Sequence, residues 1–251
     1  MSNSNSIIDL NNYKTWPGIL TDYLEERTAF FEKFCGGSIS YRDSGQLARV
    51  YDQIVVDVKS ILRPYKILGY HCCRLTELEI DAIKTEGMFL PNPTTLLKRV
   101  EKLVETGVIG KDVAHKLIKE NDAADQYRRD ILWFCFFQPY IASESGIGSF
   151  FRFWGGEALF RSHEDNIITG PILKQIGTPA IVEASLPLKD IDLVETKFVK
   201  KFMIFKKLQS HEDHEGYIVA PLQHENIINI ITHPSVRFYE LTKCQEWDIR
   251  I

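Results

Sequence analysis

Residues 65–88, YKILGYHCCRLTELEIDAIKTEGM, decide the fold class, because they predict a strand that runs directly into a helix. The first eleven residues are mostly apolar and compatible with a strand. Thr76 and Glu79, three residues apart, have the spacing of a capping box, which marks the start of a helix. Gly87 suits the position that ends it. The chain therefore mixes strands with helices rather than belonging to an all-helical class.

The chain has the composition of an ordinary globular protein. Its 251 residues suffice for one large domain or for a domain with an extension, and 44% of them are hydrophobic and 25% charged. The net charge of −4 argues against a main role in non-specific nucleic-acid binding, although residues 199–207, VKKFMIFKK, form a local basic stretch.

The sequence also predicts the cellular compartment of the protein. The polar N-terminal segment shows no secretory signal, and no window approaches eighteen apolar residues, so we expect no membrane contact. Five cysteines, an odd number, favour reduced thiols in the cytoplasm.

Hydrophobic periodicity predicts a helical segment followed by a region of strands and helices. Helices over 19–34 and 44–62 make an N-terminal helical extension, residues 1–64, and residues 65–251 form an α+β domain. In that domain two helices follow residue 91, separated by a hinge at 107–110, and a short helix begins near residue 157. Strands are expected over 131–137, 179–188, 215–222 and 235–241, and residues 197–208 have a mixed pattern that suggests another strand.

The residues of the first strand allow several kinds of site. Successive strand residues point to opposite faces, so His71 and Cys73 share one face while Cys72 and Arg74 share the other. Three adjacent residues therefore cannot hold one metal ion without distortion, and CxxC and HExxH patterns are lacking, so we expect no metal. His71 and Arg74 could activate a neighbouring thiol, but both cysteines could equally be small apolar strand residues.

Three later features have a functional and an ordinary interpretation. The stretch SGIGS, 145–149, could meet a nucleotide or be a plain loop. Glu215 stands where a strand begins, where a carboxylate could stabilise a cationic sugar, or it belongs to a solvated run of charges with Glu212 and Asp213. The aromatic residues between 133 and 160 form core or a lid over a planar ring.

Taken together, these segments resemble the ADP-ribosyltransferase family. The resemblance covers residues 65–251 and rests on the stretches YHCCRL, LEIDAIKTEGM, LWFCFFQPY, FFRFWGGEALF and EGYIVAPLQHENIINII, in the family's order. It is greatest to the bacterial toxin branch that modifies nucleic acid, and looser to the poly-ADP-ribose polymerases. It implies a split β-sheet core with inserted helices behind an N-terminal helical extension.

The resemblance also implies a set of NAD contacts. His71 would hydrogen-bond the adenosine ribose or the nicotinamide region, Cys72 and Cys73 would hold the carboxamide, and Arg74 would approach a phosphate. Glu215 would bind the 2′-hydroxyl of the nicotinamide ribose. Nicotinamide would stack on one of three aromatic side chains, Tyr140, Phe151 or Trp154.

By the same resemblance the chain is an NAD-dependent ADP-ribosyltransferase of toxin or phage-defence type. Such an enzyme cleaves the nicotinamide–ribose bond and transfers ADP-ribose to nucleic acid or protein, or hydrolyses NAD. Its partner would be an antitoxin or regulatory protein that contacts the N-terminal helices. Cysteines 72 and 73 stand where the family has glycine and threonine, and this leaves two alternatives: a non-catalytic nucleotide- or partner-binding module on the same fold, and an RNA-cleaving toxin that acts through its histidines.

Overall fold

The computed structural model describes residues 7–36, 41–140 and 147–243. Helices and strands are mixed, and strands β1–β6 belong to one open sheet in the described part of the chain. The expectation of a mixed fold is therefore confirmed.

The chain divides into two compact units, each made of two segments. Unit 1 comprises Met1–Gly69 and Ser185–Gly216, and unit 2 comprises Tyr70–Ala184 and Tyr217–Ile251. The division at residue 64 into an extension and a second domain stays a prediction.

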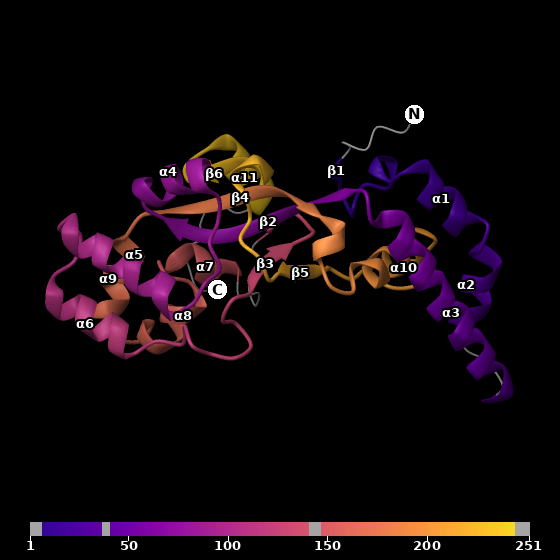
Figure 1. The fold of residues 1–251 in the computed structure, drawn as a ribbon, viewed down its shortest axis with the longest axis horizontal. Helices are drawn as coiled ribbons and strands as arrows, with labels where there is room; N and C mark the ends of the chain where they lie inside the picture. Colours follow the sequence, from indigo (N-terminus) through magenta and orange to yellow (C-terminus); the bar gives the residue numbers. More distant parts are fainter. Residues whose placement is uncertain (1–6, 37–40, 141–146, 244–251) are drawn as a thin grey trace. The chain divides into compact units, whose positions relative to one another are not determined.

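Unit 1 is mostly helical. Strand β1 (Ile7–Ile8) pairs in parallel with the first residues of β2 (Lys66–Leu75). The other elements of this unit, drawn in indigo to purple and in orange in Figure 1, are η1 (Tyr13–Thr15), α1 (Gly18–Glu25), α2 (Thr28–Cys35), α3 (Tyr41–Leu62), η2 (Leu188–Asp190) and α10 (Val194–Phe205). The helix expected over 19–34 is two helices, α1 and α2, and the helix expected over 44–62 begins earlier, at Tyr41.

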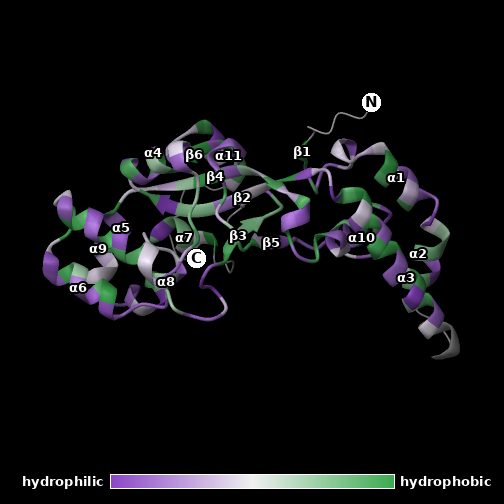
Figure 2. Cartoon of the chain, in the orientation of Figure 1, coloured by the Kyte–Doolittle hydropathy of each residue, from purple (hydrophilic) through white to green (hydrophobic). Residues whose placement is uncertain are grey.

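Residues 197–208 were expected to form a strand, and this was wrong, because α10 occupies most of them. Phe198 and Phe202, four residues apart, are fully buried. Trp16 packs edge-on against Phe198 and Phe205, with ring centroids 4.9 and 5.7 Å away. Figure 2 shows hydrophobic and hydrophilic residues together on this helix. Spacings of three and four are helical, and the interspersed lysines concealed that period.

Unit 2 is built on the sheet. The strand order is β5 (Glu215–Ile218), β3 (Leu132–Cys135), β2, β4 (Thr178–Pro187) and β6 (Ile227–Thr232). Tyr70 pairs with Cys135 in the antiparallel β2–β3 ladder, and β4 pairs antiparallel with β6. The strands expected within 131–137 and 179–188 are confirmed, so β2 lies in the middle of the sheet with a neighbour on each side.

The helices of unit 2 lie on and beside this sheet. They are α4 (Glu77–Glu86), α5 (Pro93–Glu105), α6 (Lys111–Lys119), α7 (Ile147–Arg152), α8 (Glu157–His163), α9 (Thr169–Gln175), η3 (His224–Asn226) and α11 (Val236–Thr242). Helices α5, α6, α8 and α9 gather at one end of the unit (Figure 1) and share a hydrophobic core, which includes Leu96, Leu117 and Leu173. The break between α5 and α6 at 107–110 is where the glycines predicted it.

The strand expected over 235–241 was also wrong, because these residues form α11. The Ser235 hydroxyl accepts a hydrogen bond from the Phe238 amide at 3.2 Å, which caps the helix. Phe238 and Leu241, three residues apart, are fully buried. Ser235, directly after Pro234, is a residue type that favours the start of a helix. The aromatic and β-branched residues that follow favour a strand, and the prediction followed them.

The junction of β2 and α4 has the predicted form. The Glu79 amide donates to the Thr76 hydroxyl at 3.3 Å and the Thr76 amide donates to the Glu79 carboxylate at 2.8 Å, which completes the capping box. Gly87 ends α4 with φ +87°, and a Cβ there would lie 2.0 Å from the Leu222 carbonyl oxygen. Only glycine fits this position, so the strand–helix unit has defined ends.

Candidate functional site

His71 lies in β2, the middle strand of the sheet order, and its ring hydrogen-bonds to the neighbouring strand. Its Nδ1 lies 2.8 Å from the Trp133 carbonyl oxygen on β3. A carbonyl only accepts hydrogen bonds, so Nδ1 carries the proton and donates. Burial lowers the pKa of His71 most, the nearby charge of Arg99 lowers it further, and the Trp133 hydrogen bond opposes both. The imidazole is therefore neutral near pH 7, with an unprotonated Nε2.

Nε2 of His71 is available for a hydrogen bond to a ligand. The side chain is half-buried, and no described residue hydrogen-bonds this nitrogen. A neutral Nε2 with a free lone pair can accept a hydrogen bond from a hydroxyl or take up a proton.

Cys73 shares the strand face of His71, as expected from the alternation. Its Sγ lies 3.6 Å from the Ala180 carbonyl oxygen on β4. Burial raises the pKa of the Cys73 thiol to about 12, although the charge of Arg99 works in the opposite direction. The group is a thiol at neutral pH, so it suits a pocket wall better than a nucleophile.

Glu79 organises the corner where β2 becomes α4. One carboxylate oxygen accepts from the Thr76 amide at 2.8 Å and from Trp154 Nε1 at 2.9 Å, and the other accepts from Arg99 Nε at 2.6 Å. Burial alone would raise the pKa of Glu79, but the charge of Arg99 and these hydrogen bonds outweigh it and hold the pKa below its usual value. Both carboxylate oxygens of Glu79 thus accept hydrogen bonds, and these bonds hold Thr76, Trp154 and Arg99 in position.

Arg99 of α5 is a site residue that sequence reasoning missed. Its guanidinium lies 4.6 Å from the Trp154 ring centre and uses Nε on Glu79, while its terminal amino groups have no hydrogen-bond partner among the described residues. The side chain is 31% exposed, so these groups reach solvent. The signal was its place between Leu96 and Val100, which are both buried: a charge beside the inward face of a helix needs a partner.

These groups create a mixed binding surface. The Arg99 charge lowers the pKa of both His71 and Cys73, and its guanidinium contacts Glu79 and Trp154 at the β2–α4 corner. Free guanidinium donors suit a phosphate, and the imidazole acceptor suits a sugar hydroxyl. These two side chains therefore carry donor and acceptor groups of the kinds that a phosphate and a hydroxyl require.

Cys72 and Arg74 occupy the opposite strand face and are buried. Arg74 donates from Nε to the Ile176 carbonyl at 2.7 Å and from a terminal nitrogen to the Phe151 carbonyl at 3.0 Å. These contacts tie β2 to the segments that carry α7 and α9. The phosphate contact expected of Arg74 stays a prediction, and in this structure Arg99 has the freer guanidinium.

The three aromatic residues expected at the nicotinamide differ in exposure. Phe151 and Trp154 are fully buried, the first packed edge-on against Phe238 with centroids 5.1 Å apart. Tyr140 is 39% exposed and lies 5.9 Å from the Phe137 ring. Tyr140 thus has the most accessible ring of the three.

Glu215 is the first residue of β5 and belongs to unit 1, whereas His71 belongs to unit 2. Its side chain is exposed, and its negative charge acts on Lys197 of α10. The catalytic role expected for Glu215 stays a prediction. The SGIGS stretch lies partly outside the described residues, which resume with α7 at Ile147.

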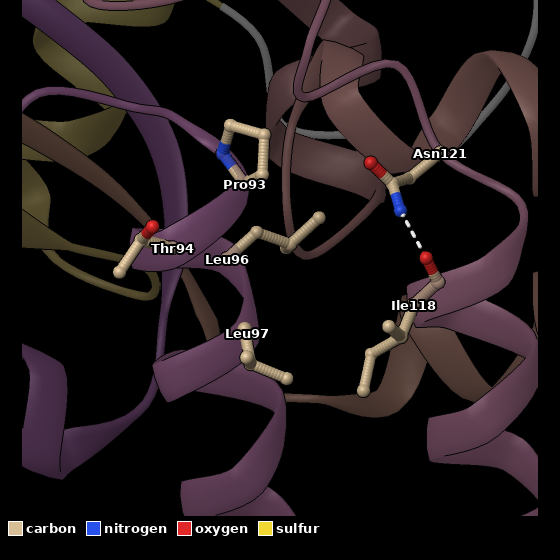
Figure 3. A pocket seen from close by; sticks show the side chains of 6 residues that line it. All are labelled: Pro93, Thr94, Leu96, Leu97, Ile118 and Asn121. Carbon is tan, nitrogen blue, oxygen red and sulfur yellow. Dashed lines mark hydrogen bonds between the residues drawn. The ribbon is translucent and has the colours of Figure 1, made fainter.

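Two surface hollows lie elsewhere in unit 2. One, of about 230 Å³, lies between α5 and α6, where Leu97 and Ile118 face each other and Asn121 Nδ2 donates to the Ile118 carbonyl at 2.6 Å (Figure 3). The second, of about 350 Å³, is lined by residues such as Ile109 and Ile172. Neither is lined by residues of the β2–α4 corner, so the chemistry and the hollows are separate.

Within 7–36, 41–140 and 147–243, no three His, Cys, Asp or Glu side chains are grouped to hold a metal ion. None of the helices in the described part of the chain is both long and apolar enough to cross a bilayer. Comparison of the chain with protein-family models, with curated proteins and with solved structures finds no match.

Proposed function

We propose that the chain is an NAD-consuming enzyme with an ADP-ribosyltransferase-like split-sheet fold. The observation that carries this proposal is His71: a neutral imidazole on the central strand, with Nδ1 fixed on the Trp133 carbonyl and Nε2 open to a ligand. The strand–helix junction beside it supports the same assignment, because the capping box holds Glu79 and hence Arg99 in place.

The division of labour follows from the chemistry of the bond. When the nicotinamide–ribose bond breaks, its electron pair leaves with nicotinamide and positive charge develops on the sugar. The acceptor then bonds to C1′ and loses a proton. A carboxylate that stabilises the cation and groups that hold the substrate are the main requirements. Glu215 supplies the carboxylate in this proposal.

The corner of unit 2 then holds the remaining parts of NAD. His71 Nε2 accepts from a ribose hydroxyl, and the Arg99 amino groups donate to the pyrophosphate. Cys73, uncharged, contacts the ring amide region, and Tyr140 offers the accessible stacking surface. The acceptor is nucleic acid, protein or water, and the setting is a bacterial cytoplasmic toxin or defence system whose partner contacts the N-terminal helices.

A second candidate function is binding of a nucleotide without turnover. One observation favours it: within the described surroundings of His71, the nearby carboxylate Glu79 already accepts from Thr76, Arg99 and Trp154. The described surroundings of His71 therefore supply groups for binding, and Glu79 is not free to act as the catalytic carboxylate.

One experiment distinguishes the NAD-consuming enzyme from the non-catalytic binding module. The full chain is incubated with NAD, with and without protein and nucleic-acid acceptors, and free nicotinamide is measured chromatographically. The enzyme proposal predicts release that falls at least 100-fold in Glu215→Gln and that Glu225→Gln, also exposed, leaves unchanged. Calorimetric NAD binding without release supports the binding module, and absence of both removes NAD from the account.

A further inference from the structure

The hollow between α5 and α6 is lined mainly by aliphatic side chains. Leu96, which is 6% exposed, connects it to the hydrophobic core that these helices share. Leu97 and Ile118 face each other across the hollow (Figure 3) and are 38% and 40% exposed. Two large aliphatic side chains left this exposed beside a hollow favour contact with another apolar group, because covering them removes apolar surface from water.

The polar groups of the hollow leave little for a polar ligand to bind. Asn121 Nδ2 donates to the carbonyls of Leu117 and Ile118, at 3.2 and 2.6 Å. Its Oδ1 accepts from the Ala123 amide at 3.0 Å, so both ends of this side-chain amide are in use. None of the residues that line the hollow carries a charge. The group that suits it is therefore uncharged and apolar.

The size of the hollow indicates a side chain rather than a whole cofactor. Its volume is about 230 Å³. Sites for drug-sized ligands and cofactors usually measure roughly 300–1,000 Å³, so this one is small for that class. In protein complexes, by contrast, a pocket is commonly filled by one anchoring side chain. An apolar groove between two helices is also a usual receiving surface for an amphipathic segment.

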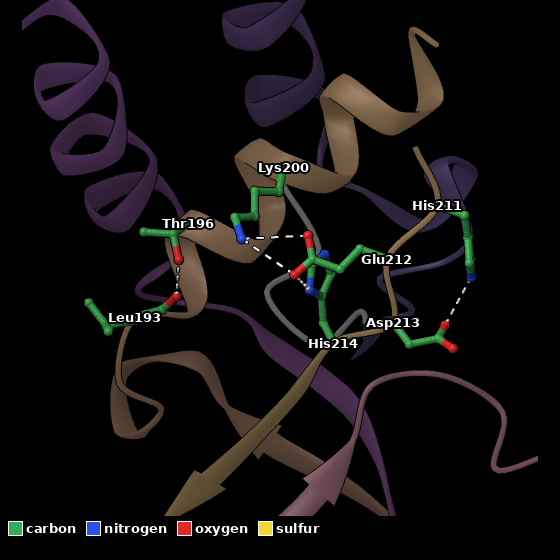
Figure 4. Close-up of polar contacts among 7 residues, drawn as sticks. All are labelled: Leu193, Thr196, Lys200, His211, Glu212, Asp213 and His214. Carbon is green, nitrogen blue, oxygen red and sulfur yellow. Dashed lines mark hydrogen bonds and ion pairs between the residues drawn. The ribbon is translucent and has the colours of Figure 1, made fainter. Parts of the chain in front are cut away.

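The charges around the hollow indicate the sign of the partner. Lys98 and Lys119 directly follow the two facing aliphatic residues, are exposed, and form no ion pair with any described residue. Lys200 of unit 1 differs in this respect, because its ammonium group lies 3.4 Å from a Glu212 carboxylate oxygen (Figure 4). Residues 93–121 contain six Lys or Arg and four Asp or Glu, a net charge of +2, whereas the whole chain has −4. This pair of helices therefore suits a negatively charged partner.

We propose that this hollow anchors a leucine-type side chain from an acidic amphipathic segment of a partner protein. The aliphatic side chain packs between Leu97 and Ile118, and carboxylates flanking it in the segment interact with Lys98 and Lys119. Exposed charges at the rim of an interface affect the rate of association and its salt dependence more than the affinity. The surface lies wholly in unit 2, is separate from the β2–α4 corner, and does not depend on the proposed NAD chemistry.

The test is fluorescence anisotropy of the full chain with a labelled acidic peptide, in which leucines recur at spacings of three and four among glutamates. Two matched peptides carry alanine in place of each leucine, or lysine in place of each glutamate. Saturable binding is expected for the acidic leucine peptide, about tenfold or more tighter than for either matched peptide, and weaker at high salt. Equal binding of the lysine peptide would exclude an acidic partner and overturn the proposal.

Matched variants locate the binding surface. Ile118→Ser removes one wall of the hollow and should weaken binding of the acidic leucine peptide about tenfold or more. Ile167→Ser makes the same change at a side chain that is 90% exposed and lines neither hollow, and it should bind like the wild type. Leu97→Ser, with the same expected loss, replaces Ile118→Ser if circular dichroism shows that variant unfolded. Absence of saturable binding to the wild type, or binding that both changes in the hollow leave unaltered, overturns the proposal.

Discussion

Replacement of Glu79 by alanine should destabilise the protein by about 3 kcal/mol. The change leaves the buried Trp154 Nε1–H without an acceptor, which costs about 1–3 kcal/mol. It also removes the bond from the Thr76 amide, worth about 0.5–1 kcal/mol as half of a capping box. The Arg99 ion pair, whose side chains are 31% and 18% exposed, adds about 0.2–1 kcal/mol after solvent screening.

Urea denaturation followed by circular dichroism measures this loss as a shift of midpoint at constant slope. Glu77→Ala, an exposed change in the same turn of α4, is the control and should cost less than about 0.5 kcal/mol. In a double-mutant cycle with Trp154→Phe, a coupling of about 1–2 kcal/mol is expected. If the free energy of unfolding of Glu79→Ala lies within about 0.5 kcal/mol of the wild-type value, Glu79 does not hold the corner, and the placement of Arg99 there loses its basis.

The same residue makes stability depend on pH in a defined direction. The pKa of Glu79 is lowered in the folded state, so its contribution is fully present above the unfolded value, near 4.5. It is lost as the pH falls through the folded pKa. The wild type and Glu79→Gln should therefore differ at pH 7 and converge in acid.

Three other predictions concern single residues. Cys73, whose thiol pKa is raised to about 12, should resist iodoacetamide at pH 8 in the native protein and react once urea unfolds it, as peptide mapping by mass spectrometry would show. Burial and the nearby lysines lower the pKa of His214 to about 4, so its protonation should reduce stability between pH 6.5 and 4, and His214→Gln should flatten that part of the pH–stability curve. Gly87→Ala should lower the thermal midpoint by several degrees, because its Cβ would meet the Leu222 carbonyl and φ is positive, whereas Gly18→Ala, with open space around it, should not.

The elements that the sequence predicted correctly are those with local chemical signals. Thr76 and Glu79 carry a capping box, and glycines mark the hinge after α5. The alternation of His71 and Cys73 against Cys72 and Arg74 follows from strand geometry alone. Each of these depends on residues a few positions apart, so tertiary packing was not needed to infer them.

The features that escaped prediction depend on packing between distant segments. Helix α10 buries Phe198 against Trp16, some 180 positions earlier, whereas the aromatic and β-branched residues of 197–208 locally favour a strand. Arg99 joins the site through Glu79, twenty positions away, and no spacing rule connects it with His71. Such contacts are set by tertiary structure and leave little trace in the local pattern.

The most direct test of the account is the state of the His71 ring in solution. Nitrogen-15 NMR of the imidazoles in the full chain, with His71→Gln to assign the signals, reports the tautomer and its response to NAD. The account predicts a neutral ring at pH 7, protonated at Nδ1, whose Nε2 resonance shifts saturably as NAD is added. A ring protonated at Nε2, or an Nε2 resonance that does not move at millimolar NAD, would contradict it.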